Sequence, residues 1–425
     1  MNDDVLNLVV IGGGAAGYFA ALRVGAERPA ARIVILESNR RPLEKVRISG
    51  GGRCNVTHNC FDPATLVQNY PRGHKELRSA FHRFQPQNML EWLSERGVAI
   101  KAEADGRMFP ESDDSSTIID CFEKERIRER VDLRLNSKAE KVAVLPNATF
   151  QIEYALKGEG SANNVTLHAE NLMLATGNHI SGHAFARQLG HTVTPLAPSL
   201  FTFNVRDSAL QELSGVSVAR VHIDLFLEGK RVAESSGPLL ITHWGVSGPA
   251  VLKLSAWAAR ELYAAGYRGV LRIHWATEHT RQQVLEQLAA YQGSNPKKTL
   301  LRSPQAGLPA RLWEYLLRST LPDLVERPWD QIGKSALQKL VDLLTNYELA
   351  FDGKGQFKDE FVTCGGVDLR EVDFRSMQSK VVPGLFFAGE ILDIDGITGG
   401  FNFQSAWTGG WIAGTAIAQR IDDQA

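Results

Sequence analysis

The chain has 425 residues, of which 44% are hydrophobic and 22% are charged, and its formal net charge is −1. This is the composition of an ordinary globular protein, and it excludes a disordered chain, a collagen-like repeat and a small disulfide-stapled scaffold. Because the charges balance, no overall field draws the chain to nucleic acid or to anionic lipid. The length predicts two domains or one elaborated domain.

The four cysteines are scattered along the chain, and none forms a C-x-x-C pair. Such spacing does not suit a disulfide framework, so we expect a reducing, cytoplasmic location. The N-terminal residues lead directly into a predicted strand, which leaves no room for a signal peptide. No stretch approaches the ~18–20 uninterrupted apolar residues of a membrane span, so we expect no membrane association.

The first 37 residues have the pattern of a dinucleotide-binding βαβ unit. Residues 6–11 form a short apolar run that predicts a buried parallel strand, and it leads directly into G-x-G-x-x-G at residues 12–17. A helix through about Glu27 and a second strand at 32–36 follow, and Glu37 closes that strand. This acid comes 20 residues after the last glycine of the motif, where such units place the group that binds a ribose.

Each position of this motif has a physical task. Gly12 permits the tight turn, Gly14 lets the backbone approach a pyrophosphate, and Gly17 lets the helix pack closely on the strand. The start of the helix, at Ala15 and Ala16, offers free N–H groups and the positive end of the helix dipole to phosphates. An acid rather than an arginine after the second strand favours a free 2′-hydroxyl, and hence FAD or NAD rather than NADP.

The C-terminal part of the chain resembles the second half of FAD-dependent enzymes of the glutathione-reductase structural type. A short apolar strand at 384–390 ends in glycine and an acid, and a glycine pair then precedes a long helix predicted near 403–418. The resemblance implies that the acid approaches the pyrophosphate and ribityl chain, and that the helix N-terminus faces the pyrimidine edge of the flavin. The expected cofactor contacts here are Gly389, Glu390, Gly400, Phe401 and Asn402.

A third segment, at 171–177, is a predicted strand that ends in Ala-Thr-Gly, as in the same enzymes, and it adds Thr176 and Gly177 to the expected contacts. Three matching segments in this order favour FAD over NAD. The sequence has no second G-x-G-x-x-G, so we expect no separate nicotinamide domain. A nicotinamide, NADH or NADPH, that docks transiently could still be the electron donor.

A second glycine-rich loop follows the second predicted strand. In residues 45–57 three consecutive glycines are flanked by serine, arginine and asparagine, and such a loop of free N–H groups suits an anion or a flavin. The run 49–57 resembles the signature of the BaiN-like (YhiN-like) bacterial flavoproteins, also described as the aminoacetone-oxidase-type FAD family. Further matches to this family lie at 106–110, 242–249, 363–367 and 389–402. The expected cofactor contacts in the loop are Ser49, Gly50, Gly51, Gly52 and Arg53.

The resemblance implies an α/β fold in which a glutathione-reductase-type FAD-binding Rossmann domain is interrupted by an inserted domain of β-barrel and helices. The sequence supports an insertion by itself, because residues 200–227 alternate like strands and three later segments have helical periodicity. These helical segments are 282–291, 310–317 and 334–344. The predicted domains are an FAD-binding domain at 1–192 and 348–425 and an insert at 193–347.

Two residues are candidate catalytic proton donors, since a flavin supplies the hydride and the protein supplies orientation and a proton. A thiol ordinarily has a pKa near ~8.5, and Arg53 and Arg47 could shift that of Cys54; alternatively Cys54 is a small residue packed in a tight loop beside the cofactor. His243 precedes a helix predicted to start near Ala250, and it could be a general acid or a histidine that caps this helix at a domain hinge.

Two further residues are candidates for substrate contact. Ser247, with Gly248, could leave N–H groups free for an anion or a carbonyl. Arg107 could hold a substrate anion or could brace a hairpin. We interpret Cys364, in a glycine-rich turn, as structural. The sequence has no zinc-ligand spacing and no nucleophile elbow, so no metal is expected.

The charge is unevenly distributed near the second glycine loop. Between Arg40 and Arg83 the chain has nine basic and three acidic residues, a local net charge of +6. This 40–83 stretch could be the electrostatic footprint of a polyanionic substrate. The alternative is a solvated surface whose charge is balanced by acids elsewhere in the fold.

The family resemblance implies reduction of an activated C=C bond, either in a steroid-like enone or in a uracil base of large-subunit ribosomal RNA, which would give dihydrouridine. The basic stretch favours ribosomal RNA, because phosphate contacts supply most non-specific affinity. Two alternatives stay open. One is an oxidase of a small amine such as aminoacetone, with oxygen as acceptor; the other is a binding or assembly factor whose FAD is structural.

Overall fold

The computed structural model describes residues 5–156, 163–355 and 362–424. The chain divides into two compact units, which we call the first unit, residues 1–196 with 362–425, and the second unit, residues 197–361. The sequence placed the insert at 193–347. The second unit extends further because β16 (Tyr347–Asp352) pairs along its length with β15 (Arg268–His274), so the chain leaves this unit only after that strand.

The first unit contains a sheet whose central strands are parallel. Their order is β20 (Leu385–Phe387), β9 (Asn163–Leu174), β1 (Val5–Ile11), β2 (Ile33–Leu36) and β6 (Asp132–Arg134). Antiparallel strands extend the sheet: β18 (Val372–Asp373) and β19 (Gln378–Ser379) beside β20, and β7 (Ser137–Val144) and β8 (Phe150–Leu156) beside β9. β1 and β2 confirm the two strands predicted at the N-terminus, and every residue of β2 is buried, as expected for an interior parallel strand.

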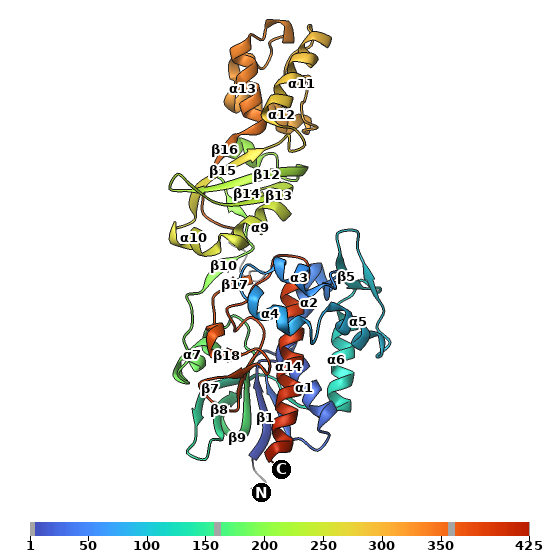
Figure 1. Ribbon diagram of the computed structural model, residues 1–425, viewed down its shortest axis with the longest axis vertical. Coiled ribbons are helices and arrows are strands. Elements are labelled where there is room, and N and C mark those ends of the chain that lie inside the picture. Colours follow the sequence, from blue (N-terminus) through green and yellow to red (C-terminus); the bar gives the residue numbers. More distant parts are fainter. Residues whose placement is uncertain (1–4, 157–162, 356–361, 425) are drawn as a thin grey trace. The chain divides into compact units, whose positions relative to one another are not determined.

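Two helices from opposite ends of the sequence lie side by side in this unit, α1 (Ala15–Glu27) and α14 (Phe401–Gln424) (Figure 1). Glycines make the contact close: a Cβ at Gly410 would lie 2.6 Å from the Ala16 carbonyl oxygen, and one at Gly414 would lie 2.7 Å from that of Ala20. The C-terminal helix begins and ends beyond its predicted limits of 403 and 418.

The remaining elements of the first unit are short. Its other helices are α2 (Glu44–Gly52), α3 (Pro63–Leu66), α4 (His74–Phe81), α5 (Pro86–Ser94), α6 (Ser116–Arg128) and α7 (Ile180–Gln188), with 3₁₀ turns at Val67–Asn69 and Leu369–Glu371. A three-stranded sheet contains β3 (Thr57–His58), β5 (Arg107–Pro110) and β4 (Ile100–Ala102), and β17 covers Val362–Cys364. Aromatic rings of Phe19, Trp92, Phe122 and Trp407 pack together between the helices, with centroids 5.0–5.9 Å apart.

The second unit is built on an antiparallel sheet that closes on itself. The strand order is β11 (Phe203–Asn204), β14 (Gly245–Ser247), β13 (Lys230–Thr242), β12 (Ser217–Leu227), β15 and β16, and β10 covers Ala197–Ser199. Hydrogen bonds join the two edges of this sheet. The Asn204 amide donates to the Gly353 carbonyl at 3.0 Å, and the Gly355 amide donates to the Thr202 carbonyl at 2.8 Å. The insert is therefore a small barrel, as expected.

Helices complete the second unit: α8 (Ser208–Gln211), α9 (Pro249–Trp257), α10 (Ala259–Ala264), α11 (Arg281–Ser294), α12 (Ala310–Thr320) and α13 (Lys334–Thr345), with 3₁₀ turns at Pro322–Leu324 and Trp329–Gln331. The three predicted helices are confirmed as α11, α12 and α13. The interpretation of 200–227 as strand throughout was wrong, because Asp207 caps α8 by accepting from the Leu210 amide at 3.0 Å. In the described part of the chain, no helix is both long and apolar enough to cross a membrane.

Candidate functional site

Only glycine fits at one position of the turn between β1 and α1 and at one position in the first turn of α1. Gly12 has φ +111°, and a Cβ there would lie 2.4 Å from the Ala175 carbonyl oxygen. A Cβ at Gly17 would lie 2.3 Å from the Gly12 carbonyl oxygen. Gly14, which N-caps α1, differs, because a Cβ there would meet nothing within 4 Å. The helix N-terminus therefore faces open space, as a phosphate site requires.

Glu37 lies directly beside this turn. It follows β2 and is buried, and its carboxylate accepts hydrogen bonds from the Gly13 amide at 2.9 Å and the Asn39 amide at 2.8 Å. The carboxylate is thus held at the carboxyl end of the strand next to the helix N-terminus. This is the place from which an acid binds a ribose hydroxyl in a dinucleotide-binding unit.

Segments from the middle and the end of the chain meet at the same helix. A Cβ at Gly389 would lie 3.1 Å from Cβ of Ala16, and a Cβ at Gly177 would lie 3.9 Å from Oε2 of Glu390. Glu390 also forms an ion pair with Lys45. The three sequence segments predicted to bind the cofactor are therefore neighbours in the fold.

Thr176, between these segments, carries a polar atom without a partner. Its Oγ1 is buried and has no hydrogen-bond partner among the described residues. An unsatisfied buried hydroxyl costs free energy unless a ligand or water completes it. Its place just after β9, beside the N-terminus of α1, suits a hydrogen bond to a bound cofactor.

The second glycine loop is partly helical. α2 is regular only to Ile48, after which Ser49 is extended and Gly50 and Gly51 have φ of 58° and 70°. Cβ atoms at Gly51 and Gly52 would meet nothing within 4 Å. The backbone at Gly51 and Gly52 therefore borders open space, which suits a segment that wraps an anion or a flavin.

The start of α14 rests on the chain that leaves this loop. A Cβ at Gly400 would lie 2.5 Å from the Thr57 carbonyl oxygen, and Phe401 stacks on His58 with ring centroids 4.5 Å apart. The Asn402 side chain bonds the Gly396 amide and carbonyl at 2.8 and 2.9 Å. His58 was not predicted to be part of the site, and only its position directly after the run 49–57 could have indicated it.

Cys54 lies beneath the loop. It is completely buried, has φ 63°, and its amide donates to the Ser49 carbonyl at 3.0 Å. Burial raises the pKa of its thiol to about 12, so the thiol is neutral at physiological pH. This arrangement favours a packing role over proton transfer to a substrate.

Arg53 and Arg107 both contact acids of the β4–β5 hairpin. Arg53 pairs with Glu103 at 2.7 Å, and Arg107 pairs with Asp105 at 2.7 Å and with Glu103 at 2.8 Å. Arg53 also lies over the ring of Phe109, 4.0 Å from its centroid. These contacts favour the interpretation in which Arg107 braces a hairpin.

His243 and Ser247 belong to the second unit. His243 is exposed in the two-residue turn between β13 and β14, and α9 begins only at Pro249, so the imidazole does not cap that helix. Ser247 lies in β14 opposite Leu240, and its hydroxyl accepts from Oγ1 of Thr202 at 3.0 Å. His243 is thus accessible, whereas the Ser247 hydroxyl is engaged within the barrel.

The basic stretch separates into paired and exposed residues. Lys45, Arg47, Arg53 and Arg72 form ion pairs with acids, and the acid that pairs with Arg72 is the fully buried Asp395. Other cations of the stretch are exposed, and they are Arg40, Arg41, Lys75, Arg78 and Arg83. The surface alternative, in which the charge is balanced elsewhere, therefore holds for part of the stretch only.

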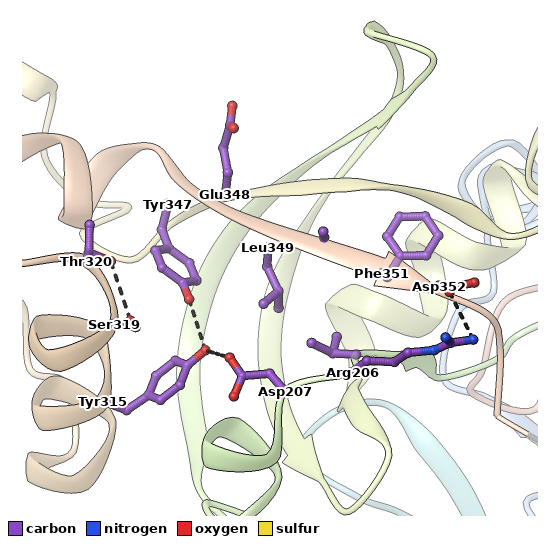
Figure 2. Close-up of a pocket in the computed structure, with 12 residues that line it drawn as sticks. Arg206, Asp207, Tyr315, Ser319, Thr320, Tyr347, Glu348, Leu349, Phe351 and Asp352 are labelled. Atoms are coloured by element: carbon purple, nitrogen blue, oxygen red, sulfur yellow. Dashed lines mark hydrogen bonds and ion pairs between the residues drawn. The ribbon is translucent and has the colours of Figure 1, made fainter.

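The second unit contains a separate cavity of about 420 Å³ between β16 and α12 (Figure 2). Within it the Tyr315 hydroxyl donates to Asp207 at 2.7 Å and lies 3.3 Å from that of Tyr347. Burial raises the pKa of both phenols. No residue of the glycine motifs lines this cavity.

Known proteins with similar sequences cover almost the whole chain. The ribosomal RNA dihydrouridine synthase of Escherichia coli (strain K12) is 29% identical over 412 residues, which are 95% of this chain and 96% of that protein. The 3-dehydro-bile acid delta(4,6)-reductase of Clostridium scindens is 27% identical over 419 residues, 97% of this chain and 98% of that protein.

Solved structures show the same fold. A flavocytochrome c3 fumarate reductase in its open conformation has a TM-score of 0.51 at 16% identity, covering 98% of this chain and 78% of that one. The 3-ketosteroid-delta4-(5alpha)-dehydrogenase of Rhodococcus jostii RHA1 also has a TM-score of 0.51, at 13% identity, covering 98% and 97%.

The residues present fit FAD. Glu37 is held beside the N-terminus of α1, Gly14, Gly51 and Gly52 border open space, and the buried Thr176 hydroxyl has no hydrogen-bond partner among the described residues. The family model described as the HI0933-like protein Rossmann domain matches residues 6–416. The chain therefore belongs to the HI0933-like family and is an FAD-dependent oxidoreductase.

Proposed function

We propose that the chain reduces an activated C=C bond and that its substrate is a uracil base in ribosomal RNA, which becomes dihydrouridine. FAD, when bound and reduced, supplies the hydride. The names of the E. coli and C. scindens relatives both denote enzymes that saturate a C=C bond, which supports the reaction type. A second relative, from Haemophilus influenzae, is also named ribosomal RNA dihydrouridine synthase and is 27% identical over 423 residues.

The observation that favours RNA over an enone is the exposed basic face of α4. Its apolar residues Leu77, Ala80 and Phe81 are buried, whereas Lys75 and Arg78 are exposed. His74 precedes them, and His82 and Arg83 follow, all three exposed. Cations on one face of a helix can contact successive phosphates of a nucleic-acid backbone.

This face is linked to the cofactor site by direct packing. Phe81 of α4 contacts Tyr70, with ring centroids 5.5 Å apart. The Tyr70 hydroxyl in turn donates to the Phe401 carbonyl at 2.6 Å, at the first residue of α14. A polyanion bound along α4 would therefore lie beside the helix whose N-terminus is expected to face the flavin.

The proton donor is a separate part of the proposal. His243 is the better candidate, because its imidazole is exposed whereas the Cys54 thiol is buried and has a pKa near 12. A neutral thiol of that pKa could lose its proton only at high cost. We therefore assign Cys54 to packing beneath the glycine loop.

Mass spectrometry of nucleosides from ribosomal RNA, with and without the gene, tests the proposal. We expect dihydrouridine to disappear on deletion and to return with the wild-type gene and with Cys54→Ala, but not with His243→Asn. Unchanged dihydrouridine in the deletion strain, in a host without a second route to the modification, would contradict the RNA substrate. Reduction of a 3-keto-Δ4 steroid by the purified protein would then support an enone substrate.

A further inference from the structure

A polar cluster on the outer face of the barrel has the composition of a metal site. His222 and Asp224 are two residues apart on β12, and their neighbours Val221, Ile223 and Leu225 are buried in the barrel core. Both polar side chains therefore point away from that core, since successive side chains of a strand alternate between its faces. On β13, Glu234 lies directly opposite Asp224 in the register.

The three side chains converge. The Nε2 atom of His222 lies 3.5 Å from a carboxylate oxygen of Asp224 and 3.7 Å from one of Glu234. One ligand atom from each residue lies within 4.8 Å of the others. Two carboxylates directly opposite one another repel, so a cation between them stabilises this arrangement.

The imidazole is held in the orientation that a metal ligand needs. Nδ1 of His222 is hydrogen-bonded to Oγ of Ser236 at 2.9 Å, which leaves Nε2 directed at the carboxylates. A partner of this kind on the second ring nitrogen is the usual device that orients a metal-binding histidine. The next strand adds a second imidazole, His274, which pairs with His222 in register and whose buried Nδ1 has no hydrogen-bond partner among the described residues.

Arg231 now provides the positive charge. Its guanidinium pairs with Asp224 at 2.5 Å and also with Glu234, and about half of the side chain is exposed. A long exposed side chain of this kind can rotate into solvent at small cost. It therefore competes with a metal ion for the same two carboxylates without blocking the histidine.

We propose that His222, Asp224 and Glu234 bind a divalent transition-metal ion on the barrel. One imidazole nitrogen with two carboxylate oxygens suits Zn²⁺ or Mn²⁺ better than Mg²⁺, which prefers a shell of oxygen ligands and water. The ion displaces Arg231 and joins β12 to β13 on their outer face. The site lies in the inserted unit and uses no residue of the FAD motifs.

The test is calorimetric titration of Zn²⁺ into the FAD-loaded protein after chelator treatment and dialysis, with Mg²⁺ as a second titrant. We expect one Zn²⁺ site that Mg²⁺ does not fill. His222→Gln should weaken Zn²⁺ binding by at least about tenfold, and Glu234→Gln should weaken it less. Arg231→Gln should strengthen it, because the competing cation is removed.

His82→Gln serves as the control, since it removes an exposed histidine from the first unit. Flavin absorbance and far-UV circular dichroism establish that each variant is folded. Saturating Zn²⁺ should also raise the thermal unfolding midpoint of the wild type and not that of His222→Gln. Equal Zn²⁺ affinity in wild type and His222→Gln, or no gain in Arg231→Gln, would overturn the proposal.

Discussion

The two units of this protein place their polar groups in different ways. In the first unit the candidate site is made largely of backbone at glycines, and the turns at Gly12 and Gly400 could not hold a Cβ without contacting another chain segment. In the second unit glycines contribute little to the polar clusters, and cross-strand register brings together side chains such as Asp224 and Glu234. A cofactor site made of backbone leaves a motif in the sequence, whereas a site made by register leaves none.

The largest effect should come from the glycine turn of the first unit. Gly12→Ala places a Cβ 2.4 Å from the Ala175 carbonyl oxygen at a φ of +111°, and we expect a loss on the order of 3 kcal/mol in unfolding free energy together with loss of FAD. Gly14→Ala is the matched variant, because its Cβ would lie more than 4 Å from every atom of the described residues other than its chain neighbours. It should keep the thermal unfolding midpoint but bind FAD more weakly.

Flavin absorbance of the purified proteins and thermal unfolding separate these two effects. If Gly14→Ala lost the fold as completely as Gly12→Ala, the distinction between a structural and a cofactor-facing glycine would be wrong.

A buried histidine of the first unit should give the next largest effect. His191 bonds Glu371 at 3.0 Å through Nδ1 and Ser379 at 2.9 Å through Nε2. His191→Ala leaves both partners without this contact and should lower the unfolding free energy by about 1–3 kcal/mol. Denaturant titration at pH 7.5 measures the loss, and a change below 0.5 kcal/mol (roughly the scale of a surface substitution) would contradict it.

This histidine also gives a pH dependence. Burial lowers the pKa of His191 below its ordinary value, so between the two values the unfolded chain binds more protons than the folded chain. Its contribution to stability is therefore complete above the ordinary pKa of ~6.5 and is lost as the pH falls through the folded pKa. The stability difference between wild type and His191→Ala should shrink from pH 7.5 to pH 5.0; a constant difference would show that the imidazole does not titrate in this range.

The basic face of α4 should affect RNA binding without affecting stability. Lys75→Gln with Arg78→Gln removes two exposed cations from the first unit, and Lys334→Gln with Lys339→Gln removes two from the second. We expect the first pair to weaken RNA binding and to reduce the slope of log K against log[salt] by about 1.5. Filter binding at several salt concentrations checks this. An equal loss of RNA affinity from the second pair would show that RNA has no preference for the basic face of α4.

The smallest effect should come from Cys54→Ala. The thiol is buried beneath the glycine loop, so its loss should cost about 1 kcal/mol and leave the reaction rate nearly unchanged. Thermal unfolding and dihydrouridine content measure the two quantities. Loss of activity in a variant that retains FAD would restore the thiol to a catalytic role.

The sequence by itself determined the cofactor half of this protein. Gly12, Gly14 and Gly17 followed by Glu37 could be interpreted without a structure, because positive φ and close backbone approach select glycine at particular spacings. The parallel strand β2 and the helices α11, α12 and α13 were also predicted, since their apolar residues follow a regular pattern.

Only the tertiary structure decided which candidate side chains are available for chemistry. Cys54 and His243 looked alike as proton donors, and burial of the first and exposure of the second separate them. The cluster of His222, Asp224 and Glu234 depends on the pairing of β12 with β13. A one-residue change of that register would move Glu234 to the opposite face, so no local pattern could have predicted it.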